Sequence, residues 1–139
     1  MQYQEFIERV RERAYIDSDE EALTLIRATL ETLAEHQAGN AAAKLAAQLP
    51  EQIGEFITNQ KSGTESEGEG FGVQEFVRRV GERAKIGEAN TAALFASSVL
   101  AVLQDAVSRE EFDKMRGTFP SEYNTLFEQE NSEAISTRY

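Results

Sequence analysis

The sequence of 139 residues contains no cysteine. Disulfides, thiolate metal sites and a cysteine nucleophile are therefore excluded together, and the composition suits a reducing compartment. No stretch approaches the roughly 20 apolar residues that a membrane-spanning helix needs. The charged N-terminal segment also lacks the apolar core of a secretion signal. We therefore expect a cytoplasmic protein with no membrane partner.

The chain also has few positively charged residues. The chain has 14 Lys and Arg residues against 25 Asp and Glu residues, which gives a formal net charge of −11. Binding to the phosphates of nucleic acids or of anionic lipids requires a basic surface. We therefore expect no nucleic acid partner, and the acidity is most simply explained as a means of staying soluble.

Patterns typical of β-strands are missing as well. The chain has no strand-length alternation of polar and apolar residues and no Asn-Gly turn. Apolar residues instead recur three or four positions apart, which is the spacing of an amphipathic helix. The sequence therefore predicts an all-α fold.

The chain contains an internal repeat, which is visible when the sequence is shifted by 70 positions. Residues 3–57 then align with residues 73–127 without a gap, and 14 of the 55 aligned positions are identical. A gapless register of this length is strong evidence for a duplicated unit. We divide the chain into repeat one (1–57), a Gly/Ser/Glu-rich linker (58–70), repeat two (71–127) and a polar tail (128–139).

Each repeat is predicted to form four helices. Ser18 and Ser108 each precede a glutamate by three positions, the pattern of a capping box at a helix start. Gly87 is predicted to stop the first helix of repeat two, and Pro50 and Pro120 suit the first turn of the fourth helices. We expect the two four-helix repeats to be related by a pseudo-two-fold axis and packed into one helical bundle.

One helix stands out by its hydrophobicity. Residues 92–107 are apolar on nearly every side, unlike the corresponding helix of repeat one. A helix of this kind is buried over most of its surface. We place it either at the centre of the bundle or at a subunit interface, where the candidate interface residues are Leu94, Val99 and Val102.

A longer motif occurs once in each repeat. Glu-Phe-(Ile/Val)-x-Arg-Val-x-Glu-Arg-Ala stands at 5–14 and again at 75–84, followed by (Leu/Phe)-Pro segments at 49–53 and 119–123. Together these motifs resemble a bacterial family known as domain of unknown function 2267, over nearly the whole chain outside the linker and tail. The resemblance implies a small helical protein built from this repeated unit. It implies no activity, substrate or catalytic residue.

Charged side chains follow patterns that favour structural roles. Glu75 and Arg79 repeat the spacing of Glu5 and Arg9, which is that of a favourable ion pair along a helix. His36 is the only histidine, and repeat two has alanine at its position, so we interpret it as a surface residue near a helix end. Because no zinc, calcium-loop or phosphate-loop spacing is present, we expect no metal and no cofactor.

Three functions remain open at this stage. We favour a non-catalytic protein-interaction module, which includes self-association into a homo-oligomer, because the chain has a very apolar helix and no catalytic pattern. The second function is a small-molecule binder with an apolar cleft between the repeats. The third is an enzyme with a Glu/Arg site that no motif reveals. The candidate cleft residues for the second function are the aromatic side chains Phe6, Phe76, Phe95, Phe112, Phe119 and Tyr123.

Overall fold

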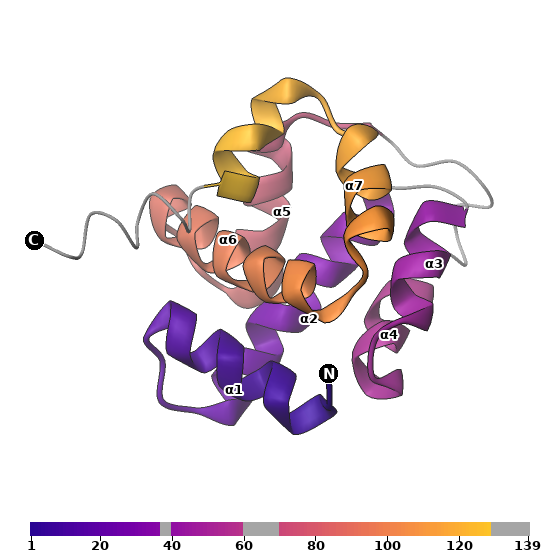
Figure 1. Ribbon diagram of the computed structural model, residues 1–139. Helices are drawn as coiled ribbons and strands as arrows, with labels where there is room; N and C mark the ends of the chain where they lie inside the picture. The colour runs from indigo at the N-terminus through magenta and orange to yellow at the C-terminus, as the bar shows by residue number, and fades with distance from the viewer. Residues whose placement is uncertain (37–39, 60–69, 129–139) are drawn as a thin grey trace, which may run out of the picture.

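The computed structural model describes residues 1–36, 40–59 and 70–128, which confirm the predicted all-α class. Every regular element in these ranges is a helix, and they contain no strand (Figure 1). Most of the predicted linker and nearly all of the predicted tail lie outside the described residues. The elements are α1 (Tyr3–Ala14), α2 (Asp19–His36), α3 (Asn40–Ala47), α4 (Glu51–Thr58), α5 (Val73–Ala84), α6 (Ala89–Ala106), α7 (Arg109–Gly117) and the 3₁₀ helix η2 (Ser121–Tyr123).

Helices at positions 70 residues apart have matching lengths. α1 and α5 both span 12 residues, and α2 and α6 both span 18 residues. Tyr15 and Lys85, which directly follow α1 and α5, both adopt the left-handed conformation, with φ of 58° and 61°. The last predicted pair of helices differs more, because α4 is an α-helix whereas its counterpart begins as η2.

The end of α5 differs from the prediction that Gly87 stops this helix. α5 ends at Ala84, and Lys85 takes the left-handed conformation that glycine more commonly provides. The Ile86 amide donates a hydrogen bond to the Gly81 carbonyl oxygen at 2.8 Å. This bond satisfies a carbonyl of the last turn and closes the helix end without a glycine.

The predicted serine caps are confirmed. Ser18 Oγ accepts a hydrogen bond from the Glu21 amide at 3.1 Å, and Ser108 Oγ accepts one from the Glu111 amide at 3.2 Å. Both bonds satisfy amide groups that have no partner inside a first helical turn. They therefore explain why α2 and α7 begin directly after these serines.

α2 and α6 form the centre of the fold (Figure 1). α2 packs against α1, α4, α5 and α6, and α6 packs against α1, α2 and α5. A central place for residues 92–107 is therefore confirmed. Of the three candidate interface residues, Leu94 is half-buried, whereas Val99 and Val102 are fully buried. Because the side chains of Val99 and Val102 are packed inside this chain, neither is accessible to a partner chain.

No single helix of the described residues is both long and apolar enough to cross a membrane. Only when taken together do α5 and α6 reach the length and apolar composition of a membrane span, and the two helices are bent by 90° relative to each other.

Candidate functional site

Charged side chains of α2 and α5 form ion pairs between the two helices. Arg83 donates a hydrogen bond to Thr32 Oγ1 at 2.7 Å, and its guanidinium also pairs with both carboxylate oxygens of Glu35. Arg79 donates to Glu35 Oε1 at 3.0 Å, and Arg83 Nε lies 3.3 Å from Glu31 Oε1. We call Glu31, Glu35, Arg79 and Arg83 the Glu/Arg ladder. A spatial cluster of the kind that an unrecognised Glu/Arg site would need is therefore present.

The carboxylates of this region are held in their ionised form. Burial raises the pKa of Glu35, but hydrogen bonds from Arg83 and Arg79 outweigh it and bring the pKa below its ordinary value. Hydrogen bonds from Arg78 and Arg79 lower the pKa of Glu75 to about 2. A general acid or base works best with a pKa near the operating pH. Glu35 and Glu75 are therefore better suited to structural ion pairs than to transferring protons.

Equivalent positions in the first half make a looser version of the ladder. Arg9 and Arg13 on α1 lie 3.8 Å and 3.7 Å from Asp105 on α6, the position that corresponds to Glu35. The predicted pair of Glu5 and Arg9 is also present, at 3.2 Å. The side chain of Arg9 is 45% exposed and that of Arg13 is 36% exposed, so each contact with Asp105 contributes little to stability. The recurrence of these contacts favours a structural role for the arginines.

His36 lies in an aromatic cluster, which contradicts the prediction of a surface histidine. The residue is only 7% exposed, and its ring stacks on Phe119 with the ring centroids 4.0 Å apart. The edges of Phe71 and Tyr123 complete the cluster at 5.1 Å and 5.2 Å. Among the described residues, neither ring nitrogen has a hydrogen-bond partner. The sequence did not reveal this environment because its members come from distant segments.

Burial of His36 predicts a stability that depends on pH. Burial lowers the pKa of His36 from the ordinary value of 6.5, and the nearby Phe71 backbone opposes this shift only in part. Below pH 6.5 the unfolded chain therefore binds a proton that the folded chain does not, and stability is lost as the pH falls toward the folded-state pKa. The slope should reach at most about 1.4 kcal/mol per pH unit.

This dependence can be measured by urea unfolding between about pH 7.5 and pH 5, where ordinary carboxylates stay largely ionised. The His36→Phe variant keeps the aromatic contacts and removes the titrating group, so its stability should change much less over this range. A slope that is the same in the variant would show that His36 is not the responsible group.

The six candidate cleft residues do not surround an open cleft. Five of them are buried in the hydrophobic core, and Phe95 is partly buried against it. Phe76 and Phe119 both pack their rings against Tyr123, with centroids 5.7 Å and 4.6 Å apart. Rings packed in the interior therefore occupy the place where a cleft between the repeats was expected.

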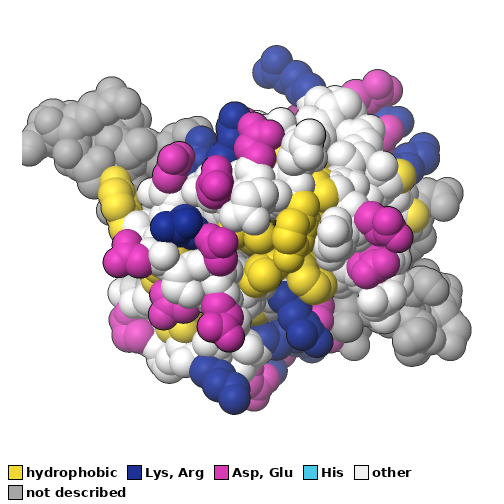
Figure 2. Space-filling model, turned by 90° about the horizontal axis from the view of Figure 1, so that it is seen from below, with side chains coloured by type: hydrophobic (Ala, Val, Ile, Leu, Met, Phe, Trp, Pro, Cys, Tyr) yellow, Lys and Arg dark blue, Asp and Glu magenta, His cyan; other side chains and the backbone are white. Residues whose placement is uncertain are grey.

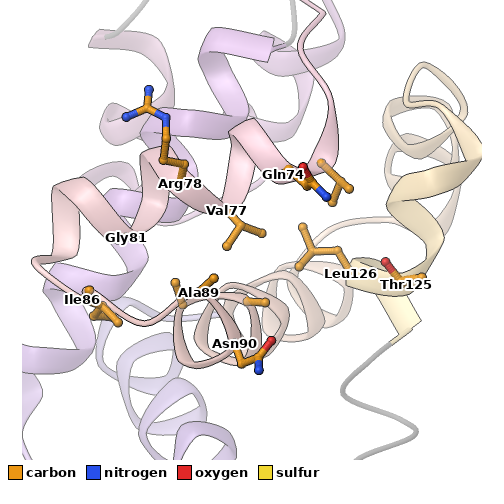
Figure 3. Close-up of a pocket in the computed structure, with 13 residues that line it drawn as sticks. Gln74, Val77, Arg78, Gly81, Ile86, Ala89, Asn90, Thr125 and Leu126 are labelled. Carbon is orange, nitrogen blue, oxygen red and sulfur yellow. The ribbon is translucent and has the colours of Figure 1, made fainter.

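A groove of about 540 Å³ opens instead between α5, α6 and the segment that follows η2. Its volume lies within the range of ligand sites, and most of its exposed lining is apolar. Figure 3 shows Val77 and Leu126 extending from facing walls, whereas the guanidinium of Arg78 points away from the cavity. None of the six candidate cleft residues lines it. We call it the α5–α6 groove, with lining residues that include Val73, Gln74, Val77, Gly81, Ile86, Ala89, Asn90, Ala93, Thr125 and Leu126.

The α5–α6 groove coincides with a reduction in side-chain size between the repeats. Gly81 stands where repeat one has Arg11, and Ala93 stands where it has Leu23. Gly81 also permits a close approach of the chain after α5, since a Cβ there would lie 2.8 Å from the Ile86 carbonyl oxygen. Other lining positions with the smaller residue in repeat two are Val73 for Tyr3, Val77 for Ile7, Ala89 for Asp19 and Leu126 for Phe56.

Larger side chains occupy the corresponding region of the first half. Arg11 pairs with Asp19 at 3.0 Å, and Gln4 donates a hydrogen bond to the same carboxylate at 3.1 Å. Leu23 and Phe56 pack partly buried against the core. Size differences at aligned positions were thus the sequence signal for the groove, and a search for motifs does not detect them.

The described residues contain no group of three His, Cys, Asp or Glu side chains that could hold a metal ion. A family model described as "Uncharacterized conserved protein (DUF2267)" matches residues 3–126. This match confirms the resemblance seen in the repeated motifs. No curated protein matches the chain.

Proposed function

The chain belongs to the uncharacterized conserved protein family DUF2267, and we propose that it is a non-catalytic cytoplasmic module that binds a segment of a partner protein. The observation that carries this proposal is the α5–α6 groove, whose walls have small residues where repeat one has large ones. Repeat one places leucine, phenylalanine and tyrosine side chains at the corresponding positions. We therefore expect the partner segment to supply apolar side chains of this kind.

The proposal includes two repeats related by a pseudo-two-fold axis. Two observations support this arrangement. The helix lengths match at a shift of 70 positions, and the arginines of α5 reach Glu35 of α2 while those of α1 reach Asp105 of α6. In such an arrangement, the open α5–α6 groove corresponds to the filled region between α1 and α2.

Energetics favour a partner with more than one anchoring side chain. Burial of one Leu or Phe side chain contributes about 1.5–3 kcal/mol. Association itself costs several kcal/mol in lost translational and rotational freedom. Two or three apolar anchors in the α5–α6 groove contribute about 3–9 kcal/mol, which after this cost supports a dissociation constant on the order of 0.1 mM or weaker. An amphipathic helix presents anchors at such spacing.

Peptides selected from a random display library against the whole protein test this proposal. We expect the selected peptides to carry two or three apolar side chains and to bind with the affinity argued above. The Ala93→Leu variant, which restores the larger residue of repeat one, should weaken their binding by about tenfold or more because it fills the groove. Ala47→Leu makes the same substitution at an exposed position of α3 and should leave binding unchanged.

Two results would overturn this proposal. One is a selection that yields no peptide with measurable affinity for the native protein. The other is a set of peptides that bind the Ala93→Leu variant as tightly as the wild type, because their site would then lie elsewhere.

The groove also supports a second candidate function, the binding of a small apolar molecule. Its volume of about 540 Å³ is sufficient for such a ligand, and Gln74, Asn90 and Thr125 offer polar groups along the lining. Native mass spectrometry of protein purified from its own host tests this alternative. A co-purifying molecule that is lost in Ala93→Leu but kept in Ala47→Leu would support it, and an unliganded mass throughout would count against it.

A further inference from the structure

Tyr15 is the exposed large hydrophobic residue of the described chain, with 82% of its surface accessible. It follows α1 in the left-handed conformation, which is uncommon for a bulky residue. Lys85 adopts the same conformation at the equivalent position, so the fold does not require an aromatic residue there. Single exposed aromatics are common in proteins. The significance of Tyr15 therefore depends on its surroundings and on a surface that matches them.

The surroundings of Tyr15 are acidic. Glu8, Glu12 and Asp17 lie with Arg11, Tyr15 and Ile16 around a shallow depression at the end of α1, where Arg11 pairs with Asp19. We call the six residues of this depression the Tyr15 surface. Figure 2 shows acidic side chains on the face on which α1 lies, together with several Lys and Arg side chains and an apolar patch.

The equivalent region at the end of α5 has a different charge. Arg78 and Lys85 lie there with a single acid, Glu82. This region continues into the α5–α6 groove, because Arg78, Gly81, Ile86 and Gly87 line both. Gly87 leaves open space, since a Cβ added there would meet no atom within 4 Å. An acidic surface with one projecting aromatic ring thus has, on the same chain, an open apolar groove bordered by Lys85 and by Arg78, whose guanidinium also pairs with Glu75 and Glu82.

On the basis of the proposed function, we infer that the Tyr15 surface of a second copy of this chain occupies the α5–α6 groove. The Tyr15 ring enters beside Gly87 and fills part of the space between α5 and α6. Glu8, Glu12 and Asp17 of that copy face Arg78 and Lys85. Such charge complementarity sets the orientation of the contact and favours this partner surface over others.

The two surfaces differ, so the contact between copies is head-to-tail. Contacts of this type close into a ring when the rotation between copies allows it and otherwise extend into a filament. The formal net charge of −11 on each chain repels copies at long range. With a small contact area and one projecting ring as well, we expect a weak contact with a dissociation constant on the order of 0.1–1 mM.

Sedimentation equilibrium of the full chain, from about 1 µM to about 1 mM, tests the inference. Tyr15→Lys installs the residue that repeat two carries in the same backbone conformation, so its thermal unfolding should match that of the wild type. We expect the dissociation constant for self-association of this variant to be at least about tenfold higher than that of the wild type. Ala93→Leu should weaken self-association in the same way. An equimolar mixture of the two variants should recover a complex, because one variant keeps the groove and the other keeps Tyr15.

A wild type that stays monomeric over the whole range overturns the inference, as does a Tyr15→Lys variant that associates as strongly as the wild type. The display-selected peptides separate this failure from failure of the proposed function. Binding of these peptides to Tyr15→Lys with wild-type affinity, together with no binding to Ala93→Leu, would support the groove as a protein-binding site, whatever the result for self-association.

Discussion

Replacement of Phe76 by alanine is expected to lower the free energy of unfolding by about 3–5 kcal/mol. The residue is 1% exposed and lies in the first turns of α5. Its ring meets Tyr123 edge-on at 5.7 Å and lies 6.4 Å from Phe71. Truncation removes these contacts and leaves a cavity between α5 and the C-terminal segment. Urea unfolding followed by circular dichroism measures the loss.

Phe95→Ala is the matched control for this prediction. The same atoms are removed from α6, but Phe95 is only partly buried. We expect a loss of roughly 1–2 kcal/mol, since less apolar surface is transferred to water and less of a cavity forms. Equal losses in the two variants would contradict the description of Phe76 as a core residue that holds α5 in place.

The second large effect is expected for Arg83→Ala, at about 1–3 kcal/mol of lost stability. This arginine bonds Thr32 and both oxygens of Glu35, and it pairs with Glu31. Its removal takes away a side chain of α5 that binds both Glu31 and Glu35 of α2, and leaves Glu31 paired with Arg27 and Glu35 paired with Arg79. The side chains of Arg83 and Glu35 are 27% and 23% exposed, so partial hydration keeps the loss below that of a fully buried pair.

Arg13→Ala tests whether this effect belongs to the ladder rather than to helix charge in general. Arg13 is the counterpart of Arg83 and lies 3.7 Å from Asp105, with 36% of its side chain exposed. The expected loss is below about 1 kcal/mol. Equal losses of unfolding free energy in Arg83→Ala and Arg13→Ala would contradict a larger stabilising contribution from the ion pairs between α2 and α5.

Local patterns in the sequence carried most of the helical architecture. Ser18 and Ser108 marked helix starts because a cap is formed by residues three positions apart. At a shift of 70 positions, α1 and α5 have the same length and so do α2 and α6, because the same local pattern of apolar residues recurs there. The failure at Gly87 is also local, since the hydrogen bond from Ile86 closes α5 and lysine tolerates the left-handed conformation.

Features that depend on distant contacts were not visible in the sequence. His36 looked like a surface residue because Phe71, Phe119 and Tyr123 reach it only after folding. The Glu/Arg ladder joins Glu35 to residues of the other repeat, which a spacing along one helix does not reveal. The α5–α6 groove is indicated in the sequence only by smaller side chains at aligned positions, such as Gly81 for Arg11 and Ala93 for Leu23, and a search for motifs does not detect such differences.

The central claim is that a protein segment binds in the α5–α6 groove and not in its filled counterpart. Methyl-selective NMR of the labelled chain, saturated with a display-selected peptide, tests this most directly. We expect shifts and intermolecular contacts for the methyl groups of Val77, Ile86 and Leu126, and unchanged signals for Ile7 and Leu23 in the filled region of the first half. Shifts confined to Ile7 and Leu23, or spread equally over both sets, would contradict the proposed site.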